Sequence, residues 1–255
     1  MKIYYYYLIM SENEYDLDIF IKNSFEETID YLKKNRIQIG RLSLRTFESL
    51  EEFQQTYKTN KKFKFATYDS EKKEIQIIKN RLKETINREV NNPNKIFISD
   101  LFTITHNGIL WPVYKNNDDI GKIIVKAITD SIVTHEIGHH MVGDSEWKAS
   151  VFEFLVYFYK NELYKYPEVY EIMERNMKIC EKFIQDKYPS PYSLGCCFAN
   201  DFIYIHENLL NKNKQSPKLN IKDAIEKLKY FSKDDEIDTT RMINTLTKIL
   251  ILLYK

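Results

Sequence analysis

The feature that most constrains this chain is a long apolar segment, residues 118–142, which contains the sequence His135-Glu-Ile-Gly-His139. Apolar residues recur through the segment at the spacing of a buried helix. Residues four apart on a helix lie one turn above each other, so the imidazoles of His135 and His139 can point from one face toward a single ion. Glu136 follows at about 100° around the helix, where it is close to such an ion without binding it.

This arrangement is typical of a zinc site that activates water. Catalytic zinc usually has three protein ligands and a water molecule, and a neighbouring carboxylate can accept the proton of that water. Three of the chain's five histidines (His135, His139 and His140) fall within six residues, which argues against a coincidental match. We therefore expect one zinc ion per chain, with Glu136 as the general base. We expect His140, about 100° around the helix from His139, to pack or to support the site.

A third ligand is expected in the segment that follows. Gly143 is placed to end the first helix, and a second helix is expected to begin directly after it. The sequence Glu146-Trp-Lys-Ala-Ser-Val-Phe-Glu153 offers two carboxylates, two helical turns apart on nearly the same face. Either glutamate is a candidate ligand from its residue type alone.

The two segments together resemble zincin metallopeptidases whose third ligand is a glutamate, and most closely the ImmA/IrrE-type proteins. In that family the His-Glu-x-x-His helix is followed by a helix that reads Glu-x-x-Ala-(Asn or Asp)-x-Phe. Glu146, Ala149 and Phe152 match this pattern, and Ser150 stands at the Asn or Asp position. The resemblance implies that Glu146 is the ligand and that Ser150 supports the site by a hydrogen bond. Spacing agrees, since Glu153 would lie about 10 Å further along the axis, as either a hydrogen-bond acceptor or a solvent-facing residue.

A predicted hairpin precedes these helices. Residues 63–69 and 74–78 are short β-type runs on either side of a polar turn, and they are similar to the family's Ala-x-Tyr…Ile-x-Ile element. The resemblance implies that the strand with Ala66, Thr67 and Tyr68 borders the cleft and pairs with an extended substrate. A hairpin that only completes the sheet is equally consistent with these residues.

A donor that stabilises the developing oxyanion is also required. Tyr192, at the start of a predicted helix, and His206, on nearly the same face of it, are candidates, and each could instead be a packing residue. Small residues are expected where helices approach closely: Gly195 on that helix, and Gly138 and Ala149 on the two helices of the zinc site.

The order of the predicted elements indicates an α+β fold with a small mixed N-terminal sheet. We expect strands at 2–9 and 37–45 and in the hairpin over 62–78, with helices near 18–35, 47–58 and 80–91. After a loop region, we expect helices at 118–142, 145–164, 168–187, 191–211, 220–232 and 237–253. The predicted division is an N-terminal α/β lobe over 1–115, which includes the hairpin, and a helical lobe over 116–255, which carries the zinc site.

Composition limits the partners and the compartment. The 38 basic and 37 acidic residues leave a net charge of +1, so no global field recruits nucleic acid or an anionic membrane. No run reaches the roughly 18 apolar residues of a membrane span. The tyrosine-rich first ten residues do not read as a secretory signal. Because Cys180, Cys196 and Cys197 do not form a disulfide framework, we expect reduced thiols in a cytoplasmic protein.

These observations favour a zinc metallopeptidase that hydrolyses a polypeptide, and the family resemblance implies that the substrate is a regulatory protein. The alternative is a regulatory or interaction protein that retains a zinc site but has little hydrolytic activity. Glu136 favours the peptidase, because a structural zinc ion needs no carboxylate beside its ligands and is usually closed by four of them. The sequence gives no expectation for the oligomeric state.

Overall fold

The computed structural model describes residues 16–91, 120–165, 169–171, 173–174, 191–204 and 220–229. The elements follow in the order α1 (Leu17–Lys34), β1 (Ser43–Phe47), α2 (Leu50–Tyr57), β2 (Ala66–Asp69), β3 (Glu74–Ile78), α3 (Lys79–Asn91), α5 (Ile120–Val142), α6 (Glu146–Lys160), the 3-10 helix η1 (Leu163–Lys165), α8 (Pro191–Tyr204) and α9 (Ile221–Lys229). The predicted strand at 2–9, the helix at 237–253 and most of the helix at 168–187 lie outside the described residues, as does the predicted domain boundary near 115.

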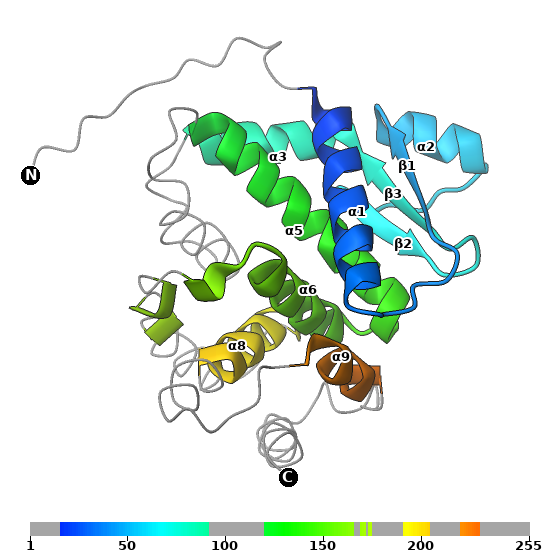
Figure 1. Ribbon diagram of the computed structural model, residues 1–255. Coiled ribbons are helices and arrows are strands. Elements are labelled where there is room, and N and C mark those ends of the chain that lie inside the picture. Colours follow the sequence, from blue (N-terminus) through cyan, green and yellow to red (C-terminus); the bar gives the residue numbers. More distant parts are fainter. Residues whose placement is uncertain are drawn as a thin grey trace, which may run out of the picture.

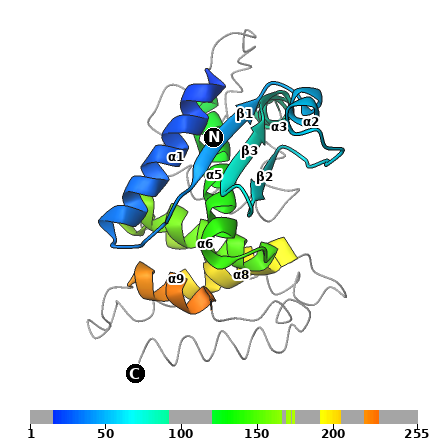
Figure 2. The ribbon, with the colours of Figure 1, turned by 90° about the vertical axis from the view of Figure 1, so that its right-hand side faces the viewer.

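The predicted α+β class, with a small mixed sheet, is confirmed. The three strands lie in the order β1-β3-β2, with β1 parallel and β2 antiparallel to β3. Helix α5 passes beside this sheet and against α1, and then continues to the part of the molecule formed by α6, α8 and α9 (Figures 1 and 2). None of the helices that the structure describes is both long and apolar enough to cross a membrane.

The expectation of a strand at 37–45 is wrong for most of that range, because β1 begins only at Ser43. The residues before it end helix α1. Arg36 has a positive φ of 58°, the N–H of Arg36 donates to the carbonyl of Lys33, and the N–H of Ile37 donates to that of Leu32. These two bonds form a Schellman motif, in which buried Ile37 also packs near Leu32. The main chain of Ile37 is therefore used by the helix end and not by the sheet.

Helix α2 also begins later than expected, at Leu50 rather than near residue 47. Ser49 caps it by accepting a hydrogen bond from the N–H of Glu52, and the Glu52 carboxylate accepts one from the N–H of Glu48 at 2.7 Å. This reciprocal arrangement resembles a capping box and fixes the helix start. The hairpin forms as expected, but its first strand begins only at Ala66, whereas β3 matches its expected range and helix α3 begins one residue early.

Helix α6 is the centre of the helical part. Every residue from Trp147 to Tyr159 is buried, because α5, α8 and α9 all pack on this helix. A Cβ atom on Gly138 of α5 would lie 3.0 Å from the carbonyl oxygen of Ala149, and one on Gly195 of α8 would lie 2.4 Å from that of Trp147. The expected close approaches at Gly138 and Gly195 are therefore confirmed.

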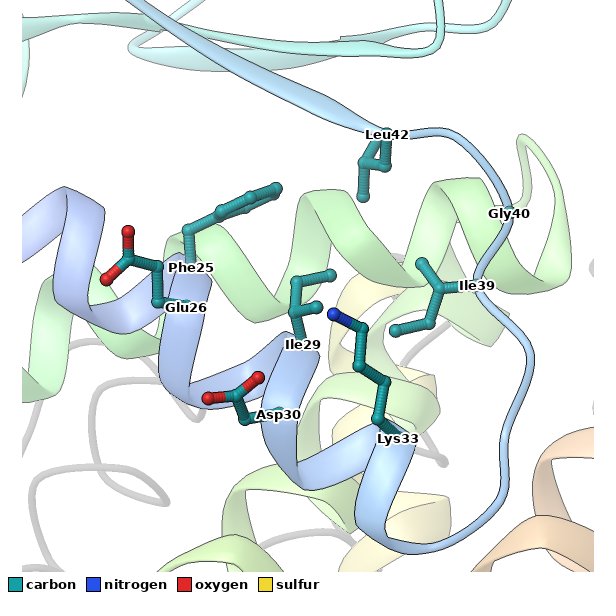
Figure 3. Close-up of a pocket in the computed structure, with 8 residues that line it drawn as sticks. All are labelled: Phe25, Glu26, Ile29, Asp30, Lys33, Ile39, Gly40 and Leu42. Carbon is teal, nitrogen blue, oxygen red and sulfur yellow. The ribbon is translucent and has the colours of Figure 1, made fainter.

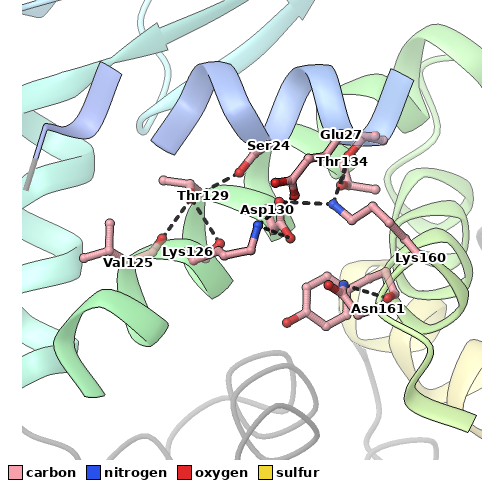
Figure 4. A network of polar contacts seen from close by, with 11 residues as sticks. Ser24, Glu27, Val125, Lys126, Thr129, Asp130, Thr134, Lys160 and Asn161 are labelled. Atoms are coloured by element: carbon pink, nitrogen blue, oxygen red, sulfur yellow. Dashed lines mark hydrogen bonds and ion pairs between the residues drawn. The ribbon is translucent and has the colours of Figure 1, made fainter. Parts of the chain in front are cut away.

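A buried polar network joins α1, α5 and α6 (Figure 4). The ammonium group of Lys160 lies 3.1 Å from both the Asp130 carboxylate and the Thr28 hydroxyl, and Thr28 in turn lies 3.2 Å from Thr134. Burial lowers the pKa of Lys160, and the charge of Asp130 opposes this shift. The network fixes how α1 and α6 are placed against α5, one helical turn before the predicted zinc ligands.

Candidate metal centre

The structure brings the three predicted ligands together. His135 and His139 lie one turn apart on α5, Glu146 is the first residue of α6, and one ligand atom from each lies within 4.8 Å of the others. His135 Nε2 is 3.1 Å from one Glu146 carboxylate oxygen, and His139 Nε2 is 3.6 Å from the other. The His135 side chain is buried, whereas 56% of the Glu146 side chain is exposed. The cluster is therefore open to solvent on the Glu146 side.

The chain turn between the ligands explains this convergence. Gly143 has a φ of +94°, a conformation that favours glycine, and its N–H donates to the carbonyl of His139. Helix α5 ends there, as expected. Ser145 is the N-cap residue of α6, so Glu146 enters the next helix only three residues after Gly143. The short turn keeps the first turn of α6 beside the last turn of α5.

Hydrogen bonds on the far side of each imidazole orient the two histidines. His139 Nδ1 lies 3.3 Å from the carbonyl oxygen of Gly143, and His135 Nδ1 lies 3.1 Å from a Glu153 carboxylate oxygen. Because both acceptors can only accept, the Nδ1 atoms carry protons. Each Nε2 atom is then directed toward Glu146 as a potential metal ligand. The residues present therefore fit a divalent metal bound by two imidazoles and one carboxylate.

Glu153 is the hydrogen-bond acceptor, the first of its two expected alternatives. Its side chain is fully buried, with one oxygen on His135 and the other accepting a 2.5 Å hydrogen bond from the Ser131 hydroxyl. Sequence reasoning missed Ser131. It precedes His135 by four residues and so lies one turn away on the same face of α5, a spacing that could have identified it.

Ser150 contacts the main chain of Glu146 and not its side chain. Its hydroxyl donates a 2.8 Å hydrogen bond to the main-chain carbonyl of Glu146, one turn earlier in α6. Ser150 is fully buried, close to Gly195 of α8. It supports the helix turn that carries Glu146, and it does not contact the Glu146 carboxylate.

The cluster is strongly coupled electrostatically. Burial opposes a charge on His135, but hydrogen bonds with Glu146 and Glu153 outweigh it and raise the pKa of His135 to about 10. The same contacts with His135 and His139 hold the pKa of Glu146 well below its usual range. Without a metal, His135 therefore retains a proton, which supplies the positive charge that a bound cation would otherwise give.

Glu136 is buried beside the ligand pair and faces the sheet. Burial raises the pKa of its carboxyl group, while His135, His139 and a hydrogen bond from the backbone N–H of Tyr68 oppose this shift. The buried side chain and its raised pKa suit a group that must accept a proton near neutral pH.

Strand β2 is the outermost strand of the described sheet at this point, and its inner edge pairs with β3. The N–H of Ile78 donates to the carbonyl of Phe65 at 2.8 Å, so the alternation of an antiparallel pair directs the N–H and C=O groups of Ala66 and Tyr68 outward. The strand predicted to receive substrate thus borders Glu136, and its part in substrate binding stays a prediction.

His140 supports the surroundings of the site, as expected. Its Nδ1 atom lies 2.7 Å from the Tyr68 hydroxyl and its Nε2 atom lies 2.5 Å from the carbonyl oxygen of Ile39, so both ring nitrogens have partners other than the ligand cluster. The Ile39 side chain lines a cavity of about 450 Å³ between α1 and residues 39–42 (Figure 3). The metal cluster lies outside this cavity.

The oxyanion donor stays a prediction. Tyr192 lies in the first turn of α8, but its side chain is outside the described part of the structure, as is the whole of His206. No other described residue was predicted for this role.

Comparisons with models of known protein families, with curated proteins and with solved structures gave no match. The site is therefore described by its own geometry: a His135, His139 and Glu146 group that could hold a metal ion, compatible with an HExxH-plus-glutamate zinc site.

Proposed function

We propose that this chain is a zinc-dependent peptidase that hydrolyses peptide bonds of an extended polypeptide. The main observation in support of this proposal is the position of Glu136. It follows His135 on α5, is buried, and faces the backbone N–H of Tyr68 on the edge of β2 that does not pair with β3. This position, between the candidate metal ligands and a strand edge, is where a general base would act.

The donor set supports zinc as the metal. Two imidazoles and one carboxylate are typical of catalytic zinc sites, which keep a position open for water or substrate. His135, His139 and Glu146 would hold the ion, and the exposed side of Glu146 would leave it accessible. Zinc bound there would polarise the scissile carbonyl and make water a nucleophile near neutral pH.

The chain's own residues would orient the ligands and move the proton. Glu153 and the Gly143 carbonyl fix the imidazole orientations, so little reorganisation is needed when the metal binds. Glu136 would accept a proton from the attacking water and pass it to the leaving amine. Its raised pKa favours this shuttle, because a base works best when its pKa is near the operating pH.

An extended polypeptide is the substrate class that fits the strand edge. Main-chain groups of Ala66 and Tyr68 face outward from β2 and could pair with a substrate strand, while side-chain pockets would select the sequence. We propose a regulatory protein as the natural substrate, on the family resemblance. Cys196 and Cys197 are buried neighbours in the chain, and adjacent cysteines rarely bridge, which is in keeping with the cytoplasmic compartment that we propose.

The test combines metal analysis with cleavage of a peptide library. We expect about one zinc ion per purified chain, and cleavage products, detected by mass spectrometry, that disappear when a chelator is added and return with zinc. Zinc without cleavage of any peptide or bound protein would favour the alternative, a regulatory protein with a retained zinc site. Absence of any bound transition metal, even after zinc is added, would reject both.

A further inference from the structure

Helix α5 carries two pairs of residues with i,i+4 spacing on neighbouring faces. The first pair, His135 and His139, points toward Glu146. The second pair, Glu136 and His140, points toward β2, and both of its members contact Tyr68. Glu136 faces the backbone N–H of Tyr68, and His140 Nδ1 lies 2.7 Å from the Tyr68 hydroxyl. One residue of the edge strand is thus held at its main chain and at its side chain by two successive turns of one helix.

The direction of each hydrogen bond at His140 is fixed by its partners. The Ile39 carbonyl can only accept, so His140 Nε2 carries the proton and Nδ1 accepts from the Tyr68 hydroxyl. The Tyr68 ring also meets the His140 ring edge-on, with centroids 5.4 Å apart. Burial, with Asp144 and Asp69 nearby, raises the pKa of Tyr68 and keeps its hydroxyl a donor. His140 therefore joins α5 to β2 and to the segment before β1.

We propose that His140 is a positioning residue, which seats strand β2 on helix α5 so that the outward N–H of Tyr68 meets the Glu136 carboxyl group. The inner edge of β2 pairs with β3, and the Tyr68 side chain contacts α5 through its hydrogen bond with His140. This bond joins the strand to the helix one turn after Glu136.

A catalytic consequence follows, and it rests on the proposed function. A substrate strand that pairs with the outer edge of β2, opposite β3, needs the Tyr68 N–H as a donor. Because His140 seats Tyr68 on the turn of α5 that follows Glu136, a substrate strand paired there would lie beside the proposed base.

Amide hydrogen exchange, resolved by residue with NMR, tests the seating in the purified full chain at known zinc content. We expect the Tyr68 amide to be protected, although it points away from β3. His140→Ala should speed its exchange at least tenfold, while Thr67, which pairs with Gln76, keeps its protection. His140→Gln, which can both accept from Tyr68 and donate to Ile39, should restore most of the protection. Unchanged exchange at Tyr68, or an equal loss at Thr67, would overturn the proposal.

A double-mutant comparison of kcat/KM provides the second readout. His140→Ala and Tyr68→Phe remove the same hydrogen bond, so the double variant should be no slower than the worse single variant, with zinc content unchanged. Tyr57→Phe is the matched control, since it removes a tyrosine hydroxyl bonded to Glu74 elsewhere on the sheet. Additive losses would contradict the proposal. If no variant or parent hydrolyses any peptide, the proposed function fails, and the exchange experiment still decides the seating.

Discussion

The buried carboxylate of Glu153 accepts a hydrogen bond from Nδ1 of His135 at 3.1 Å, while its other oxygen accepts one from Ser131 at 2.5 Å. A ligand imidazole oriented by a carboxylate is more basic and is held in the tautomer that a metal requires. Ser131 on α5 and Glu153 on α6 therefore both help to orient His135, the first candidate ligand of the cluster.

Loss of the hydrogen bond between Glu153 and His135 should weaken metal binding. Glu153→Gln should lower zinc affinity by about 10- to 100-fold, the usual effect of losing such a supporting group. Ser131→Ala should have a smaller effect in the same direction. Competition with a chromophoric chelator measures both. Glu162→Gln removes an exposed carboxylate paired with Lys165 and serves as the control. Equal zinc affinity in Glu153→Gln and the parent would show that His135 needs no partner.

Glu146 should matter more for the metal than Glu153. Its carboxylate oxygens lie near the Nε2 atoms of both histidines, so Glu146→Ala removes one of three ligands and should lower zinc affinity by orders of magnitude. Loss of the Glu146 hydrogen bond to His135 should also lower the unfolding temperature of the metal-free variant slightly, because more than half of the Glu146 side chain is exposed and solvent screens the interaction. A larger loss of affinity in Glu153→Ala than in Glu146→Ala would contradict the ligand assignment.

Metal binding should release a proton. The pKa of His135 is raised from 6.5 to about 10 in the metal-free protein, so this imidazole is charged at pH 7 and must lose a proton before it binds zinc. Apparent zinc affinity should therefore rise with pH between about 7 and 10. Calorimetric titrations in two buffers of different ionisation enthalpy measure the release. Identical heats in both buffers would contradict it.

The same shift affects the stability of the metal-free chain. Because the folded pKa of His135 exceeds its unfolded value, its contribution is fully present below pH 6.5 and is lost as the pH rises through about 10. Bound zinc replaces this proton, so the zinc-loaded protein should show a weaker loss of stability over this range.

Close helix packing gives a prediction that is independent of the metal. A helical Gly→Ala change on an open face stabilises by about 1 kcal/mol. At Gly195, however, the new Cβ would lie 2.4 Å from the Trp147 carbonyl oxygen, so Gly195→Ala should destabilise by about 1–3 kcal/mol. Gly138→Ala, with a contact of 3.0 Å, should cost less. Urea unfolding compares them, and a stabilised Gly195→Ala variant would be the contrary result.

Local patterns predicted much of this arrangement. The i,i+4 spacing of His135 and His139, the stop at Gly143 and the start of α6 at Glu146 all follow from helix geometry and capping, which operate within a few residues. The hairpin was predicted for the same reason, since its turn lies between two short β-type runs.

Contacts between distant segments were not predicted. The bonds from His140 to Ile39 and Tyr68 join residues that are 101 and 72 positions apart, and no local spacing encodes such pairs. The prediction of a strand over 37–45 is wrong for a related reason. The alternating apolar residues Ile37 and Ile39 resemble a strand, but the N–H of Ile37 bonds to the end of α1 and the carbonyl of Ile39 bonds to α5.

The most direct test of the proposed peptidase compares zinc-loaded parent protein with zinc-loaded Glu136→Gln on a peptide that the parent cleaves. Gln keeps the size of the side chain and a hydrogen-bond acceptor for Tyr68, but it cannot take a proton. Both proteins should bind one zinc ion per chain, and the variant should cleave at least about a hundredfold more slowly, the scale of general base catalysis. Equal cleavage rates, or loss of zinc from the variant, would contradict the assignment of Glu136 as the base.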